Sequence, residues 1–188
     1  MPHLLSPEEY VALERKLGVK HEYHAGQVFA MAGVSVPHAR IQMNFAYRLT
    51  GALMDSPCSA YPSDLRVVIE AADMATYPDL SIVCGKVERA KAFKHSCVNP
   101  TVLLEVLSPS TERYDRGVKF DQYRKLNSLR EYVLISQDAM AVDLYRLNSG
   151  LWVFHSLRGE EAVLSLASTG IEIPLSDIYR GVNFEDAE

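Results

Sequence analysis

The first third of the chain alternates apolar and polar residues in the order helix, strand, strand, helix. Ser6-Pro7-Glu8-Glu9 is a capping box with proline at the first helical position, and Gly18 follows the last turn of that helix. Two short strands joined at Ala25-Gly26 and a segment of helical spacing come next. These patterns predict helices at Pro7–Leu17 and Val36–Met54, with strands at His21–His24 and Gln27–Met31 between them.

The rest of the chain is mostly short β-rich runs with one further helix. Strands are predicted at Leu65–Glu70, Asp79–Cys84, Thr101–Leu107 and Glu131–Ser136, a helix at Thr111–Asn127, a hairpin at Val142–Leu147 and Leu151–Leu157, and one or two edge strands after Ala162. The run Thr101–Leu107 is almost wholly apolar, which is typical of a central strand covered on both faces. The pattern predicts an α/β (α+β) fold with a central mixed sheet flanked by helices.

Length and composition favour a single domain over residues 1–188, because 188 residues with 48% hydrophobic content suffice for one sizeable core. The chain has no linker-like stretch, no signal peptide and no apolar run of membrane-spanning length, so we expect a soluble cytoplasmic protein. Three cysteines, Cys58, Cys84 and Cys97, are odd in number and form no CxxC pair. We expect them to be reduced thiols.

The net charge of −5 argues mildly against a nucleic-acid partner, but its distribution favours one. Residues 86–130 contain ten Lys and Arg against five Asp and Glu. An ordinary solvated face with charged helices explains the same imbalance, and composition does not decide between the two.

Glu105 is the first candidate for chemistry, because it places one carboxylate inside the apolar run Thr101–Leu107. Burying an unpaired carboxylate is costly, so its charge must meet a cation or be neutralised by a proton, unless the strand end is exposed. A metal ion supplies such a cation. A structural ion pair with an arginine is the alternative interpretation.

Asp79 opens the preceding strand, and the two strands are connected closely enough to be neighbours in one sheet. Asp79 and Glu105 could then face one another, and two converging carboxylates with open water positions suit Mg²⁺ or Mn²⁺. Alone, Asp79 after Pro78 would be a turn residue.

The helix after Pro109-Ser110 offers a cation near these acids. Asp115, Lys119 and Tyr123 recur at four-residue spacing and share one face, which predicts that Lys119 points inward, where it could orient an attacking water. An Asp115–Lys119 pair that only steadies the helix is the competing interpretation.

With these residues in place, the sequence resembles the PD-(D/E)XK nuclease superfamily, and within it the Uma-type restriction endonuclease family. The resemblance covers most of the chain. It rests on Glu22-Tyr-His-Ala-Gly26 with Met31, His38 near a helix start, Asp64-Leu-Arg-Val67, Pro78-Asp79-Leu-Ser-Ile-Val83, Leu104-Glu105-Val-Leu-Ser108-Pro-Ser-Thr111, Asp115…Lys119…Tyr123, and Glu131-Tyr132-Val.

The resemblance implies a restriction-endonuclease-like core with an N-terminal hairpin and extra C-terminal strands. It implies that Asp79 and Glu105 hold the metal with the main-chain carbonyl of Val106, and that Glu22 completes the site. The sequence departs from the superfamily pattern at Leu107, where a lysine is expected. Lys119 would be its substitute from the following helix.

We therefore expect a Mg²⁺- or Mn²⁺-dependent endonuclease that hydrolyses DNA phosphodiester bonds, with Asp79, Glu105, Lys119 and Glu22 as catalytic residues and the three acids as metal ligands. The alternative, suggested by Leu107 and the acidic net charge, is an inactive nucleic-acid-binding or assembly module that keeps the fold. A homodimer is also expected, because the hairpin after Val142 should expose Trp152 and Phe154 on one side, and two-fold symmetry suits cutting of both strands.

Overall fold

The computed structural model describes residues 4–31 and 33–186. The helices are α1 (Pro7–Leu17), α2 (Val36–Ala52), α3 (Glu112–Tyr114), α4 (Phe120–Tyr123) and α5 (Leu175–Ile178), with a π-helical turn at Asp115–Lys119 and 3₁₀ turns at Glu70–Ala72 and Phe184–Asp186. The strands are β1 (His21–His24), β2 (Gln27–Ala30), β3 (Cys58–Pro62), β4 (Arg66–Ile69), β5 (Met74–Thr76), β6 (Leu80–Cys84), β7 (Ser96–Cys97), β8 (Val102–Leu107), β9 (Glu131–Ser136), β10 (Ala141–Asn148), β11 (Leu151–Arg158), β12 (Val163–Leu166) and β13 (Ile171–Pro174).

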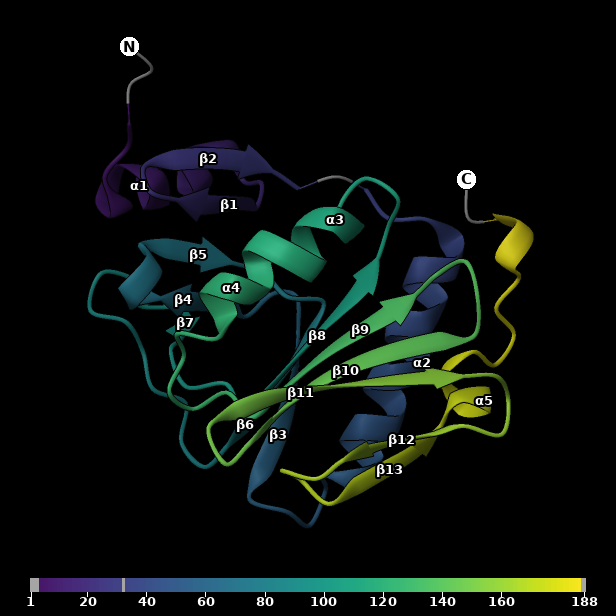
Figure 1. The fold of residues 1–188 in the computed structure, drawn as a ribbon. Coiled ribbons are helices and arrows are strands. Elements are labelled where there is room, and N and C mark those ends of the chain that lie inside the picture. Colours follow the sequence, from purple (N-terminus) through teal and green to yellow (C-terminus); the bar gives the residue numbers. More distant parts are fainter. Residues whose placement is uncertain (1–3, 32, 187–188) are drawn as a thin grey trace.

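A six-stranded mixed sheet in the order β11-β10-β9-β8-β6-β3 forms the centre of the molecule (Figure 1). β8 and β9 are parallel, and the remaining neighbours in this sheet are antiparallel. The parallel pair is joined by a helical crossover that contains α3, the π-helical turn and α4. The structure thus confirms the predicted central mixed sheet flanked by helices.

The two faces of β8 belong to two different apolar cores. Val102, Leu104 and Val106 pack with residues of α2, α5 and the β12–β13 hairpin. Leu103 and Leu107 point the other way and pack with α4 and Leu126. Because side chains alternate along a strand, Glu105 shares the second face, and the helix that covers this face supplies its neighbours.

A second, five-stranded sheet in the order β2-β1-β5-β4-β7 was not predicted. The sequence patterns missed three strands, β3, β5 and β7. β5 has three residues and β7 has two. Runs this short have too few residues to establish a period of two, and their conformation depends on the strands beside them. This sheet packs against α1 through Tyr10, Tyr23 and Val68.

The strands expected after Ala162 are present as β12 and β13, which pair with each other in a separate two-stranded sheet. One expectation about the C-terminal half is wrong. In the hairpin of β10 and β11, Phe154 is 51% exposed as expected, but Trp152 is partly buried. The ring of Trp152 packs edge-on against Phe120 of α4, with 5.3 Å between ring centroids, because the crossover helix extends over this part of the sheet.

The expectation of three reduced thiols is also wrong. Cys58 and Cys84 form a disulfide, because the antiparallel register of β3 and β6 places them directly opposite each other. Cys97 is free and buried. No helix in the described part of the chain is long and apolar enough to cross a membrane.

Candidate active site

Asp79 and Glu105 meet where β6 begins beside the middle of β8. β6 and β8 pair antiparallel up to Leu80 opposite Leu104, so the next residues, Asp79 and Glu105, are brought together. The main-chain N–H of Asp79 faces Glu105 Oε2 at 3.3 Å, and the N–H of Val106 donates to Asp79 Oδ2 at 2.8 Å. The predicted proximity of the two carboxylates is confirmed.

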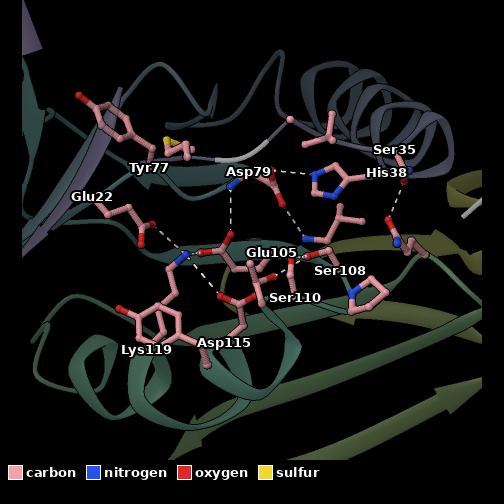
Figure 2. Close-up of a pocket in the computed structure, with 18 of the residues that line it drawn as sticks. Glu22, Ser35, His38, Tyr77, Asp79, Glu105, Ser108, Ser110, Asp115 and Lys119 are labelled. Carbon is pink, nitrogen blue, oxygen red and sulfur yellow. Dashed lines mark hydrogen bonds and ion pairs between the residues drawn. The ribbon is translucent and has the colours of Figure 1, made fainter. Parts of the chain in front are cut away.

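Lys119 lies inside a group of three carboxylates, as Figure 2 shows. Its Nζ is 2.8 Å from Glu105 Oε1, 3.1 Å from Glu22 Oε1 and 3.4 Å from Asp115 Oδ1. Tyr123 Oη donates to the same Glu105 Oε1 at 2.8 Å. The inward face predicted from the spacing of Asp115, Lys119 and Tyr123 is therefore present, with all three side chains buried.

The backbone that presents Lys119 is a π-helical turn between α3 and α4 rather than the regular α-helix that was predicted. π-helical turns are uncommon and are found mostly within α-helices, often at functional sites. The turn is stabilised from below by Tyr132 of β9, whose Oη donates to the carbonyl of Asp115 at 3.1 Å. The periodicity of the sequence could not predict the π-helical turn, because its inward residues have nearly the spacing that an α-helix gives.

Burial and crowding of like charges perturb the titration of this group. Burial raises the pKa of Glu105 to about 8, with Asp115 and Asp79 adding to the rise and Lys119 opposing it. The pKa of Asp115 is also raised, chiefly by burial. Burial alone would lower the pKa of Lys119, but Glu105, Glu22 and Asp115 hold it well above its ordinary value. Lys119 is therefore an ammonium cation surrounded by more negative charge than it can neutralise.

His38 is a site residue that the sequence reasoning treated as no more than a helix-start or packing residue. It lies at the start of α2, whose N-cap Ser35 accepts from the N–H of His38. Its Nε2 is 3.1 Å from Asp79 Oδ1, and Gln42 one turn later donates to the main-chain carbonyl of Asp79 at 2.9 Å. The start of α2 thus fixes the orientation of Asp79. Only the tertiary contact reveals this role.

These side chains border a cavity of about 590 Å³. Its lining includes four carboxylates, those of Glu22, Asp79, Glu105 and Asp115, and a single ammonium group, that of Lys119. Ser108, Ser110 and Thr111 line another part of it as a cluster of hydroxyl groups. A phosphate would be repelled from such a lining unless a cation entered with it.

The donor set fits a divalent cation that prefers oxygen. Mg²⁺ commonly binds through one or two carboxylates and keeps several waters. Asp79 and Glu105 would supply the carboxylates. The N–H of Val106 points to Asp79, and in an extended strand the carbonyl of the same residue points to the same edge. Among the described residues, no group of three or more His, Cys, Asp or Glu side chains is arranged to hold a metal ion.

Other predicted positions have simpler surroundings. Glu22 in β1 contacts Lys119 and accepts a hydrogen bond from Thr76 Oγ1. Asp64 is exposed and pairs with Lys20 at 2.7 Å, outside the cavity. Leu107 is buried in the core formed with α4, which explains how an apolar residue is accommodated where the superfamily pattern has lysine.

Comparisons with known proteins place the chain in a family. The model of the Uma2 family, described as "Putative restriction endonuclease", matches residues 7–176. The uncharacterized protein slr1290 of Synechocystis sp. is 36% identical over 181 residues, which is 96% of this chain and 94% of that protein. A second uncharacterized Synechocystis protein, sll1609, is 28% identical over 165 residues, 87% of this chain and 93% of that protein.

A solved structure has the same fold. The crystal structure described as "a putative nuclease belonging to DUF820" from Anabaena variabilis superposes with a TM-score of 0.73 and covers 93% of this chain and 97% of that one. At 18% sequence identity, this likeness shows the fold alone. The family match extends over most of the chain, including Asp79, Glu105 and Lys119. The chain belongs to the Uma2 family of restriction-endonuclease-like proteins.

Proposed function

We propose that the protein is a Mg²⁺- or Mn²⁺-dependent endonuclease that hydrolyses phosphodiester bonds in DNA. The observation that supports this most is the excess of carboxylates over cations in a cavity where Asp79 and Glu105 adjoin each other. A fold stabilised only by ion pairs would match each buried acid to a cation. This cavity instead has four acids and one lysine, which favours a site that takes up a further cation.

A divalent cation bound there would supply Lewis acidity to the scissile phosphate and lower the pKa of a water. Asp79 and Glu105 would hold it, with the carbonyl of Val106. His38 and the N–H of Val106 fix the two oxygens of Asp79. Lys119 and Tyr123 fix Oε1 of Glu105, so Oε2 is left toward Asp79. Glu22 is proposed as the third acidic residue and also holds Lys119 in place.

Lys119 is proposed to orient the attacking water or to bind a phosphate oxygen. Its Nζ is 2.8 Å from Glu105, so it adjoins the carboxylate proposed as a metal ligand. With its pKa raised, it stays protonated and acts by donating hydrogen bonds rather than by accepting a proton.

DNA is proposed as the substrate because of the family and the exposed basic side chains on one loop. The loop between β6 and β7 exposes Lys86, Arg89, Lys91 and Lys94, whereas Arg116 and Arg124 of the crossover are paired with carboxylates. Cations on such a loop can neutralise backbone phosphates without reading the base sequence.

The decisive experiment measures cleavage of plasmid and oligonucleotide DNA with Mg²⁺, with Mn²⁺ and with EDTA. Wild type is expected to cleave only with the cations. Asp79→Asn and Glu105→Gln are expected to lower the rate on the order of 10²–10³-fold. Glu172→Gln, which changes an exposed glutamate of β13, is the control and should cleave like wild type.

The opposite results would separate the two functions considered. Cleavage by Glu105→Gln at the wild-type rate would contradict the proposed site. Tight DNA binding by wild type without any cleavage in either metal, and without calorimetric binding of Mg²⁺, would instead support an inactive nucleic-acid-binding module with this fold.

A homodimer is proposed from the edge of the main sheet. β11 is an edge strand and exposes Leu151, Val153 and Phe154. Apolar side chains on an open strand edge are covered when a second copy pairs with it. Sedimentation at micromolar concentration should give twice the monomer mass. A monomeric wild type would contradict the homodimer, and a dimer that Leu151→Lys leaves intact would contradict this interface.

A further inference from the structure

Phe29 is an exposed aromatic residue in the wall of the candidate active-site cavity. Its side chain is 48% exposed, and it lines the same cavity as Glu105 and Lys119. Phe29 lies in β2, an edge strand of the five-stranded sheet, in the hairpin drawn at the upper left of Figure 1, to the left of α3. A phenylalanine at this place faces whatever enters the cavity.

The register of the hairpin fixes how close Phe29 lies to the charged group. Phe29 is directly opposite Glu22 in the antiparallel pair β1–β2. Directly opposite residues present their side chains on the same face of the sheet, with Cβ atoms about 5 Å apart. Glu22 Oε1 is 3.1 Å from Lys119 Nζ, so Phe29 is paired with a residue that contacts the group proposed to hold the reacting phosphate, and it lines the same cavity.

Core packing does not account for Phe29. It belongs to none of the three apolar clusters formed by the described residues. Met31 and Val34 also line the cavity and are 37% and 56% exposed. The cavity is therefore divided into an apolar wall and a carboxylate–lysine floor. A nucleotide has the matching division, with a flat apolar base beside a charged phosphate.

The burial of Glu105 and Lys119 at the bottom of the cavity limits which forms of nucleic acid can contact them. Glu105 and Lys119 are each only 5% exposed, so a phosphate must enter the cavity to contact them. In a regular duplex the faces of each base are covered by its stacked neighbours, and the base can stack on a side chain only after leaving the helix. Aromatic side chains bind unpaired bases by such stacking, with little dependence on sequence.

We infer that Phe29 is a stacking platform for an unpaired nucleobase next to the scissile phosphate, so that this cavity selects DNA that is single-stranded or unpaired at the position of cleavage. The inference rests on the proposed nuclease function and specifies its substrate class. Phe29 would be a substrate-binding residue, and the carboxylates and Lys119 would remain the residues that act on the phosphate.

The test uses a short single-stranded DNA that contains the fluorescent base 2-aminopurine, together with its fully paired duplex. Both are titrated with protein in Ca²⁺, and cleavage of the same DNAs is measured separately in Mg²⁺. The variants are Phe29→Ala, Phe29→Tyr and, as the matched control, Tyr47→Ala, since Tyr47 is 75% exposed on α2 and does not line the cavity.

Wild type, Phe29→Tyr and Tyr47→Ala are expected to bind the single strand more tightly than the duplex and to quench 2-aminopurine on binding. Phe29→Ala is expected to lose the quenching and to bind the single strand about ten-fold more weakly, with its affinity for the duplex little changed. Rescue by tyrosine distinguishes stacking from a merely structural role.

Unchanged quenching and affinity in Phe29→Ala, equal or tighter binding of duplex by wild type, or no DNA binding at all would overturn the inference. The two hypotheses fail separately. Quenching that depends on Phe29 without cleavage in Mg²⁺ supports the stacking platform and contradicts the nuclease. Cleavage that depends on Glu105 but not on Phe29 supports the nuclease and contradicts the stacking platform.

Discussion

Two neighbouring parallel strands each bury one glutamate, and the surroundings of the two glutamates differ. Glu131 begins β9 and is 0% exposed. It is 2.8 Å from Arg146 Nε, and it accepts hydrogen bonds from the main-chain N–H groups of Ala167 and Ser168 at 3.0 and 3.1 Å. The hydroxyl of Ser168 donates to it as well. One buried charge thus meets one cation and three further donors.

Glu105 in β8 is 5% exposed and is surrounded differently. Its cation, Lys119, is shared with Glu22 and Asp115, and Asp79 approaches from the other side. Burial of a carboxylate therefore does not mark a site by itself, because Glu131 is buried more completely. We propose that the ratio of acids to cations around a buried carboxylate separates a candidate site such as that of Glu105 from a structural ion pair such as that of Glu131.

The largest effect on stability is expected from removing the cation of each group. Lys119→Met removes the cation shared by Glu22, Glu105 and Asp115 and should lower the free energy of unfolding in EDTA by about 3 kcal/mol, near the low end for a broken buried pair, because Glu105 can take up a proton. Millimolar Mg²⁺ should restore part of the loss. Urea unfolding with and without Mg²⁺ measures both quantities.

Arg146→Met is the matched control for that measurement. Arg146 is partly exposed, and Glu131 keeps its three other donors, so the loss should be about 1–2 kcal/mol and Mg²⁺ should not change it. Equal rescue of both variants by Mg²⁺ would show that the two groups do not differ in their need for a cation.

Replacing each glutamate with glutamine should change the free energy of unfolding in opposite directions. Glu131→Gln removes a charge that its surroundings stabilise and should cost about 2 kcal/mol. Glu105→Gln relieves repulsion among acids and leaves Lys119 paired with Glu22 and Asp115, so the free energy of unfolding in EDTA should stay equal or rise by about 1 kcal/mol. Thermal unfolding of both variants against wild type decides. A loss of several kcal/mol in Glu105→Gln would instead make Glu105 half of a structural ion pair.

The last comparison is the dependence on pH of the stability difference between Glu105→Gln and wild type. The pKa of Glu105 in the folded protein is about 8, above its ordinary value of 4.5, so the folded state holds a proton that the unfolded chain has released between these values. The contribution of this group to stability is therefore full below about pH 4.5 and falls as the pH rises toward 8.

Glutamine does not titrate, so the advantage of Glu105→Gln over wild type in EDTA should widen across that range of pH. Mg²⁺ stabilises the ionised carboxylate and should reduce the widening. Unfolding curves at several pH values test this, and an advantage that shrinks as the pH rises would contradict the raised pKa.

Local patterns in the sequence determined several elements of the fold, among them those that bear the candidate site. The capping box at Ser6 fixed the start of α1, and the apolar run around Glu105 identified the central strand and its buried carboxylate. The spacing of Asp115, Lys119 and Tyr123 placed three inward side chains on one face, although the backbone there is a π-helical turn. Such features depend on residues a few positions apart, whose geometry is set by the repeat of the helix or strand.

Tertiary structure alone decided which distant residues meet. His38 precedes Asp79 by 41 positions and contacts it because α2 packs on the sheet that Asp79 enters. The pairing of Cys58 with Cys84 and the five-stranded sheet follow from strand order and register. The contrast between Glu105 and Glu131, which occupy similar apolar runs, follows from them as well. Register between strands far apart in the chain is fixed by long-range packing of whole faces, so no window of the sequence contains it.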